Sequence, residues 1–198
     1  MASIGSESRP VFTDQSCVSL VGMAGAGKTT LGKLLAARLD WAHLDTDRLI
    51  ESWWGQPLQT LLDERGREAF LACEEAAVAA LSVRRCVVST GGSAVYAPRA
   101  VDRLRALGPV VFLRVGLDAF LRRVGRAERR AFVMRPDMDL ADVWRERQPL
   151  YEAAAHAVFD TETADPEESA NDIVRWLDGL RDAPRSAAAP EPLLPPNK

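Results

Sequence analysis

The sequence predicts an α/β protein built on a five-stranded parallel sheet that is flanked by helices. Short apolar runs alternate with amphipathic segments along the central part of the chain, which is typical of a parallel sheet covered on both faces. A glycine-rich turn joins the first apolar run to the first amphipathic segment. With 198 residues, 47% of them hydrophobic, the chain is long enough for one domain with a sizeable core.

Five short, mainly apolar runs are expected to form the strands. They cover residues 17–21, 42–45, 86–90, 110–115 and 157–160. Parallel sheets bind their ligands outside the carboxyl ends of the strands. Asp45, Thr90, Gly91 and the loop after Val21 all follow strands, so we expect them to gather at one edge of the sheet.

Helices are expected between these strands. The segment 29–39 carries leucines at helical spacing, and Gly55 and Pro57 separate two short helices at 49–54 and 58–64. Proline marks two others: Pro98 lies in the first turn of one, and Pro149 is expected to interrupt or kink another. The remaining helices are predicted over residues 66–82, 98–107, 117–124, 140–155 and 166–180.

Composition excludes several classes of protein. The net charge is −3 with both signs interspersed, so the chain lacks the basic face of a nucleic-acid-binding protein, apart from a local arginine cluster between residues 122 and 130. No apolar run is long enough to span a membrane, and the N-terminus lacks the apolar core of a signal peptide. We expect a cytoplasmic monomer whose partner is a small molecule, with no nucleic acid and no membrane.

The cysteines and the termini complete the domain organisation. Cys17, Cys73 and Cys86 are odd in number and widely spaced, which predicts reduced thiols rather than a disulfide framework or a zinc site. Residues 1–16 are expected to be a flexible lead, and the Ala/Pro-rich residues 183–198 a disordered tail. The predicted single domain covers residues 17–182.

The glycine-rich turn carries the strongest functional signal. Residues 22–29, Gly-Met-Ala-Gly-Ala-Gly-Lys-Thr, match G-x-x-x-x-G-K-[ST] between a predicted strand and a predicted helix. The glycines let backbone N–H groups turn toward phosphate oxygens, and the helix N-terminus adds its positive dipole. Lys28 is expected to reach the β- and γ-phosphates of ATP, and Thr29 to bind Mg²⁺. The expected nucleotide-binding residues are Gly22, Gly25, Gly27, Lys28, Thr29 and Thr30.

Four segments beyond this P-loop follow in a fixed order. They are His-Leu-Asp-Thr-Asp-Arg-Leu-Ile-Glu at 43–51, Gly-Arg-Glu-Ala-Phe at 66–70 with Glu74, Ser-Thr-Gly-Gly at 89–92, and Arg-Gln-Pro-Leu-Tyr at 147–151. Their order and spacing resemble the shikimate kinase family, a branch of the nucleoside-monophosphate-kinase-like P-loop fold. The resemblance covers residues 18–180 and implies an ATP- and Mg²⁺-dependent metabolite kinase with a lid over residues 125–139.

The resemblance implies a role for each matching position in the acceptor site. Asp45 would hold Mg²⁺, and Asp47 would hydrogen-bond the acceptor hydroxyl and orient it or take its proton. Gly91 and Gly92 would form a backbone wall that the acceptor approaches closely. Arg147 would grip the acceptor carboxylate.

Two further arginines have implied roles near the nucleotide. Arg123 matches a position near the adenine, and Arg130 matches a lid arginine that contacts the transferring phosphate, which makes it catalytic with Lys28 and Asp47. Other interpretations stay open: a pair of acids after a strand also suits a helix N-cap and first turn, and each arginine also suits a solvated helix surface.

Three positions depart from the family pattern. Leu71 stands where the family has an arginine that helps to bind the acceptor carboxylate, and Ser93 replaces a third glycine. The lid reads Arg-Arg-Ala-Phe-Val-Met-Arg-Pro over residues 129–136 in place of R-P-L-L. The lid arginine that faces the phosphate is therefore Arg129, Arg130 or Arg135.

Leu71 suggests a hypothesis about the acceptor. With one arginine fewer, Asp47 and Glu74 are less neutralised, and an unpaired carboxylate in a partly buried pocket is costly. An acceptor with an ammonium group, such as homoserine, would restore the balance. The alternatives are a genuine shikimate kinase, a non-catalytic nucleotide-binding module, and a nucleic-acid-linked P-loop protein.

Overall fold

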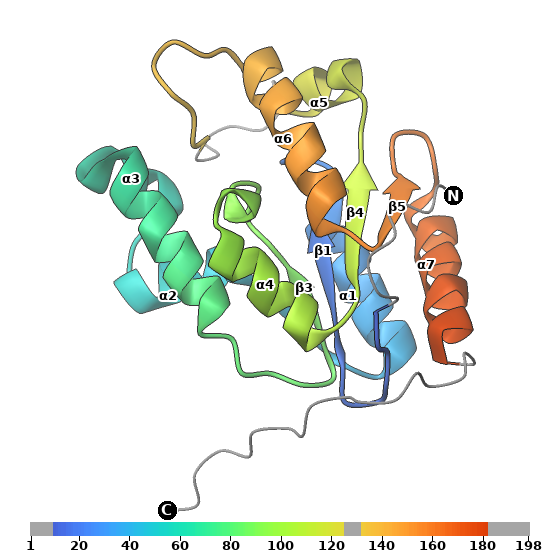
Figure 1. Ribbon diagram of the computed structural model, residues 1–198. Coiled ribbons are helices and arrows are strands. Elements are labelled where there is room, and N and C mark those ends of the chain that lie inside the picture. Colours follow the sequence, from blue (N-terminus) through green and yellow to red (C-terminus); the bar gives the residue numbers. More distant parts are fainter. Residues whose placement is uncertain (1–9, 125–131, 182–198) are drawn as a thin grey trace, which may run out of the picture.

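The computed structural model describes residues 10–124 and 132–181 (Figure 1). Its sheet has five strands in the order β2-β3-β1-β4-β5, and every neighbouring pair runs parallel, as predicted. The strands start and end within one residue of the predicted runs. They are β1 (Cys17–Val21), β2 (Ala42–Asp45), β3 (Cys86–Ser89), β4 (Val110–Arg114) and β5 (Ala157–Asp160).

Helices connect the strands largely as predicted, and some boundaries differ. The α-helices are α1 (Lys28–Leu39), α2 (Thr46–Trp54), α3 (Leu58–Ala79), α4 (Pro98–Leu107), α5 (Leu117–Val124), α6 (Leu140–Ala154) and α7 (Pro166–Arg181). An unpredicted 3₁₀ turn, η1, covers Ala94–Tyr96. α6 continues through Pro149, so the predicted interruption there is wrong.

α2 and α3 differ most from the prediction. α2 begins at Thr46 instead of residue 49, because the Asp45 side chain accepts hydrogen bonds from the backbone N–H groups of Asp47 and Arg48 and caps the helix. The two helices predicted at 58–64 and 66–82 follow one another within α3, and the backbone between them is non-helical at Gly66 (φ 76°, ψ 172°), where the sequence predicts the break. Glycine tolerates this left-handed value of φ without steric cost.

The helices cover the sheet on both faces (Figure 1). α1 and α7 pack together on one face, and α4 and α6 lie on the other, in front of the sheet in Figure 1. α2 and α3 form a lobe at the left of the view, packed against α4. The strands are the centre of the core, with Val18, Leu20, Val87 and Phe112 fully buried.

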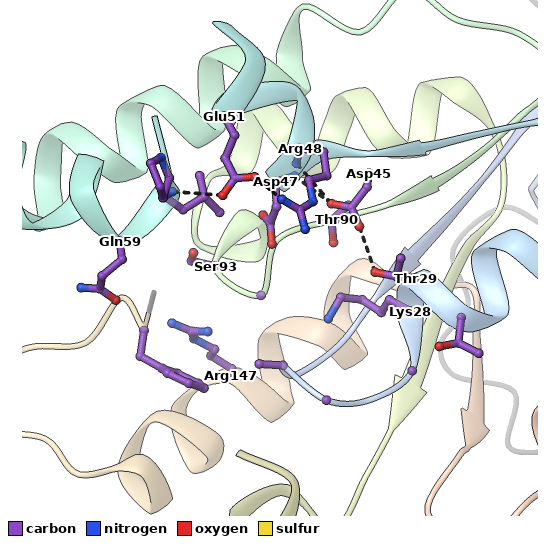
Figure 2. A pocket seen from close by; sticks show the side chains of 18 of the residues that line it. Lys28, Thr29, Asp45, Asp47, Arg48, Glu51, Gln59, Thr90, Ser93 and Arg147 are labelled. Atoms are coloured by element: carbon purple, nitrogen blue, oxygen red, sulfur yellow. Dashed lines mark hydrogen bonds and ion pairs between the residues drawn. The ribbon is translucent and has the colours of Figure 1, made fainter. Parts of the chain in front are cut away.

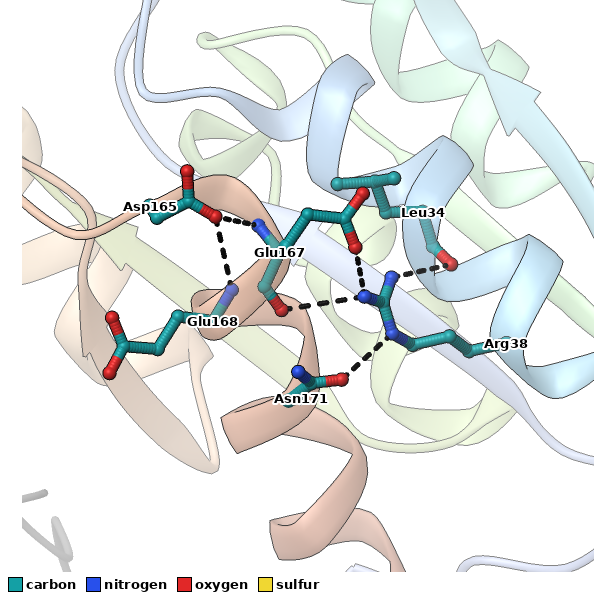
Figure 3. A network of polar contacts seen from close by, with 6 residues as sticks. All are labelled: Leu34, Arg38, Asp165, Glu167, Glu168 and Asn171. Carbon is teal, nitrogen blue, oxygen red and sulfur yellow. Dashed lines mark hydrogen bonds and ion pairs between the residues drawn. The ribbon is translucent and has the colours of Figure 1, made fainter.

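A polar network joins α7 to α1 (Figure 3). Arg38 donates from Nε to Asn171 Oδ1 at 3.0 Å, and it pairs with the Glu167 carboxylate. Asp165 accepts hydrogen bonds from the N–H groups of Glu167 and Glu168 and so caps α7. Because these groups are largely exposed, the network fixes the register of the two helices more than it stabilises the fold.

Part of the segment that precedes β1 also packs against the domain. Phe12 is 5% exposed, lies 5.7 Å from the Trp41 ring, and is covered by the Arg181 guanidinium 4.7 Å from its ring centre. Phe12 is thus packed against the domain, although the predicted domain begins at residue 17. In the described residues, no helix has the length and apolar character needed to cross a bilayer.

Candidate active site

A cavity of about 970 Å³ opens at the carboxyl ends of β1, β2 and β3. Figure 2 shows Lys28, Asp47 and Arg147 pointing toward this space from different sides. The P-loop forms one wall, α2 and the start of α3 form another, and the segment after β3 forms the floor. The sequence-predicted residues among its lining are Gly25, Gly27, Lys28, Thr29, Thr30, Asp45, Asp47, Gly92 and Arg147.

The P-loop has the wrapped shape that phosphate binding requires. Gly22 has φ +144°, and a Cβ there would lie 2.6 Å from the Leu113 carbonyl oxygen, so only glycine fits. Gly27 has φ +92° and precedes the first turn of α1. Lys28 is 9% exposed, and its Nζ donates to the carbonyl oxygens of Gly22 and Met23 at 2.7 and 2.8 Å. These contacts hold the ammonium at the cavity wall within the loop.

Thr29 and Asp45 form a pair of oxygen donors beside the loop. Thr29 Oγ1 donates to Asp45 Oδ2 at 2.9 Å, while Oδ1 of the same carboxylate caps α2. Asp45 can therefore cap α2 with one carboxylate oxygen and bind a metal ion with the other, so the two interpretations of this residue are compatible. A hydroxyl and a carboxylate suit Mg²⁺, which usually takes few protein ligands and completes its shell with phosphates and water. In the described residues no cluster of three or more acidic, His or Cys side chains could hold a metal ion without such help.

Asp47 and Glu74 converge on Gly91. A Cβ at Gly91 would lie 2.6 Å from Asp47 Oδ1 and 2.1 Å from Glu74 Oε1. The two carboxylate oxygens are consequently no more than about 4.7 Å apart, close enough for each charge to disfavour the other. Gly91 also donates its N–H to Thr46 Oγ1 at 3.0 Å, which fixes the wall against the start of α2.

Glu74 entered the sequence analysis only as an acid of the acceptor pocket, without a role of its own. It is 2% exposed, and its Oε2 atom has no hydrogen-bond partner in the described part of the chain. Burial raises the pKa of Glu74 to about 7, and the charge of Asp47 adds to this effect. A hydrogen bond with Ser93 acts in the opposite direction. The serine that replaces a family glycine is thus a polar partner for this carboxyl group.

Arg147 forms the opposite wall of the cavity. It is 2% exposed, and it donates from Nη2 to the Val133 carbonyl at 2.6 Å and from Nε to the Tyr96 hydroxyl at 3.2 Å. A Cβ at Gly92 would lie 3.1 Å from Arg147 Nη1, so this nitrogen faces the glycine wall. The cavity therefore has a buried guanidinium at one side and a carboxylate pair at another.

Comparison with known proteins identifies the family. The family model described as shikimate kinase matches residues 24–178. The chain belongs to the shikimate kinase family. The shikimate kinase of Moorella thermoacetica is 36% identical over 169 residues, which cover 82% of this chain and 97% of the relative. That of Chromohalobacter salexigens is 35% identical over 168 residues, covering 83% and 93%.

Solved structures of shikimate kinases share the fold. The enzyme from Acinetobacter baumannii, in complex with shikimate, has a TM-score of 0.75 at 28% identity and covers 85% of this chain and 96% of its own. The enzyme from Bacteroides thetaiotaomicron has a TM-score of 0.70 at 28% identity, covering 83% and 99%. The chain is thus a kinase that phosphorylates a hydroxyl group, and the predicted P-loop fold is confirmed.

Leu71 and Arg123 lie outside the cavity lining of this shikimate kinase family member. Leu71 packs on an apolar cluster that contains Phe70 and Val133. Arg123 donates to the carbonyl oxygens of Gly25, Thr161 and Glu162 at 2.9 to 3.0 Å, so it ties the P-loop to the segment after β5. Its assignment to the nucleotide stays a prediction.

Of the three candidate lid arginines, only Arg135 lies within the described residues. Arg129 and Arg130 lie outside the described residues, so the catalytic role of Arg130 stays a prediction. Arg135 is half-exposed and forms ion pairs with Asp137 at 3.5 Å and Glu146 at 3.4 Å. These surface contacts occupy its guanidinium.

Gly91→Ala is expected to lower kcat/KM for the acceptor by about 10²-fold, because the new methyl group must displace Asp47 and Glu74 by about an ångström or more. Steady-state kinetics would measure the loss. Gly179→Ala is the matched control, since a Cβ there meets nothing within 4 Å. Equal kinetics for the two variants would show that the wall at Gly91 is not part of the acceptor site.

Glu74→Gln is expected to change how stability depends on pH. The pKa of Glu74 in the folded protein, about 7, lies above the ordinary 4.5, so the folded state binds this proton more tightly than the unfolded chain. The wild type should lose roughly 3 kcal/mol of unfolding free energy through this group as the pH rises between those values. The variant should escape this loss.

Urea unfolding at pH 5 and pH 8 would measure the effect (the pH values bracket the pKa of about 7). The unfolding free energy of Glu74→Gln, relative to the wild type, should rise between the two. Glu68→Gln, exposed on the same helix, controls for the loss of one negative charge from α3. A constant difference between Glu74→Gln and the wild type would contradict a buried, titrating Glu74.

Proposed function

We propose that this kinase transfers the terminal phosphoryl group of ATP to a hydroxyl of a small hydroxy acid, with shikimate as the first candidate acceptor. One observation carries the proposal. A single cavity brings together the P-loop with Lys28, the Asp47 carboxylate and the buried Arg147 guanidinium. Those three groups suit a triphosphate, a hydroxyl and a carboxylate.

The residues divide the reaction between them. The P-loop N–H groups and Lys28 hold the phosphates, and Thr29 with Asp45 would hold Mg²⁺, which neutralises developing charge on the phosphate oxygens. Asp47 accepts a hydrogen bond from the acceptor hydroxyl and takes its proton as the oxygen attacks the γ-phosphorus. The bond from that phosphorus to the bridging oxygen breaks, and ADP leaves with the electron pair.

Arg147 positions the other end of the acceptor. A guanidinium binds a carboxylate through paired hydrogen bonds, and burial strengthens them. Arg147 Nη1 faces the Gly92 wall, where such a carboxylate would be held while the hydroxyl meets Asp47. Positioning of this kind is the main contribution that a protein makes to phosphoryl transfer.

Homoserine is the second candidate acceptor. The apolar Leu71 and the unpartnered Oε2 of Glu74 favour an acceptor that brings a cation. Protonation of Glu74 is an alternative to a bound cation, because a neutral Glu74 needs no counter-charge and can donate a hydrogen bond to a hydroxyl. A Glu74 carboxyl group that is protonated, as its raised pKa favours, suits the hydroxyls of a polyhydroxy acid and needs no ammonium.

A substrate panel tests the proposal. We expect turnover of shikimate at about 1–100 s⁻¹, with ADP release coupled to acceptor phosphorylation. Homoserine and gluconate would be assayed beside it at the same ATP concentration. Turnover of homoserine without shikimate would reverse the order of the two candidates, and ATP binding with no turnover of any acceptor would favour a non-catalytic nucleotide-binding module.

A further inference from the structure

A second arginine, Arg67, does not itself line the cavity, but it contacts the ring of Tyr96, three residues beyond Ser93 of the cavity wall. Arg67 is the first residue after the Gly66 kink of α3. Its Nε is buried and, in the described part of the chain, has no hydrogen-bond partner. Nearly all buried polar atoms in native proteins are paired, and leaving one unpaired is costly. Such an unpaired N–H group suggests that a bound ligand accepts its hydrogen bond.

Arg67 and Arg147 meet against the same ring. The Arg67 guanidinium carbon lies 5.7 Å from the centre of the Tyr96 ring, and that of Arg147 lies 5.0 Å from it. Tyr96 ends η1, which directly follows the Gly92–Ser93 wall of the cavity. Arg147 also donates to the Tyr96 hydroxyl, so Tyr96 connects the second arginine to the first.

The two guanidinium groups at this ring lack a directly paired carboxylate in the described residues, although the charge of Glu74 acts on Arg147. In residues 10–124 and 132–181, neither guanidinium forms an ion pair with an Asp or Glu side chain within 4.0 Å. Both guanidinium groups contact the same ring, and an anion bound between them would be stabilised by both charges. Leu71 lies one turn further along α3 and is apolar, so Arg67 is the residue of this helix face that can supply the charge.

We propose that Arg67 is a specificity-determining residue that binds the acceptor carboxylate together with Arg147. The inference rests on the proposed function, because it names a second contact within the same acceptor site. Guanidinium pairs recognise carboxylates by geometry as well as by charge, so acceptors without a carboxylate should have a higher KM.

The test compares a charged acceptor with a neutral one. Arg67→Gln should raise KM for shikimate by about 10- to 100-fold and leave KM for ATP unchanged. For shikimate methyl ester, which lacks the negative charge, the wild type and Arg67→Gln should have the same KM. Arg67→Lys, which keeps the charge and loses the paired geometry, should fall between them.

Arg65→Gln is the matched control, because Arg65 lies on the same helix and stacks 3.9 Å from the exposed Trp54 ring instead. It should leave both KM values unchanged. An unchanged KM for shikimate in Arg67→Gln would overturn the proposal, and so would an equal rise with the acid and the ester, since a structural role would affect both.

Binding separates this inference from the proposed function. If shikimate is not phosphorylated, shikimate would be titrated into the wild type and Arg67→Gln by calorimetry in the presence of ADP. Binding by the wild type that is lost in Arg67→Gln supports the carboxylate site although the proposed function has failed. Absence of binding to the wild type, or equal binding to both, overturns the inference.

Discussion

Lys28→Met is expected to lower kcat by about 10²- to 10³-fold, as removal of one preorganised charge at a reacting phosphate does. The Lys28 ammonium donates hydrogen bonds to two carbonyl oxygens of the P-loop, at 2.7 and 2.8 Å. These bonds hold it at the P-loop without a bound nucleotide. Methionine keeps the length of the side chain and loses the charge. Single-turnover kinetics with saturating ATP would measure the chemical step directly.

Lys33→Met is the matched control for Lys28→Met, because Lys33 is exposed on the same helix. It should keep kcat within about twofold of the wild type, as surface substitutions away from a site usually do. In Lys28→Met the carbonyl oxygens of the loop lose their hydrogen-bond donor, which could destabilise the fold. Thermal unfolding of both variants would therefore be measured to establish that the fold is intact. A folded Lys28→Met variant with wild-type kcat would show that the P-loop lysine does not act on the transferred group.

Asp47→Asn is expected to lower kcat by about 10²- to 10⁴-fold with little change in KM for ATP. Asparagine has the same shape and can still hydrogen-bond a hydroxyl, but it cannot take the proton. The substitution also removes the negative charge that helps to raise the pKa of Glu74. That pKa should therefore fall in Asp47→Asn, and NMR titration of the Glu74 carboxyl carbon would detect it.

Asp63→Asn is the matched control for Asp47→Asn, since Asp63 also lines the cavity but accepts a hydrogen bond from Gln59 at its rim. It should change neither kcat nor the pKa of Glu74. If Asp47→Asn kept wild-type kcat, the acceptor hydroxyl would have to be oriented by another group. If the pKa of Glu74 were unchanged, the two carboxylates would not interact as their convergence on Gly91 implies.

The sequence predicted the shape of the P-loop well, because its geometry is local. Gly22, Gly27 and Lys28 lie within one strand–turn–helix unit, so their spacing along the chain determines their spacing in space. Short apolar runs predicted the strands for the same reason: each strand is a short, mostly apolar segment of the chain. The start of α2 was predicted three residues late, at residue 49, although the alternative interpretation of Asp45 as a helix N-cap is the arrangement that the structure shows.

The acceptor half could be predicted only in outline. Glu74 meets Asp47 and Gly91 through the packing of α3 against α2 and η1, and no pattern along the chain encodes that convergence. Arg67 received no role from the sequence, because its contact with Tyr96 and the burial of its Nε come from the packing of α3 against η1. The kink at Gly66, which changes the direction of α3 just before Arg67, had been interpreted as a break between two helices.

Phosphorus NMR of the reaction with shikimate tests the central claim most directly. The enzyme would be supplied with ATP, Mg²⁺ and shikimate, and the spectrum followed as ADP forms. We predict a phosphomonoester signal that grows in step with ADP and is absent when shikimate is omitted. ATP consumed to give only inorganic phosphate, or no consumption at all, would contradict the assignment of this cavity to phosphoryl transfer onto shikimate.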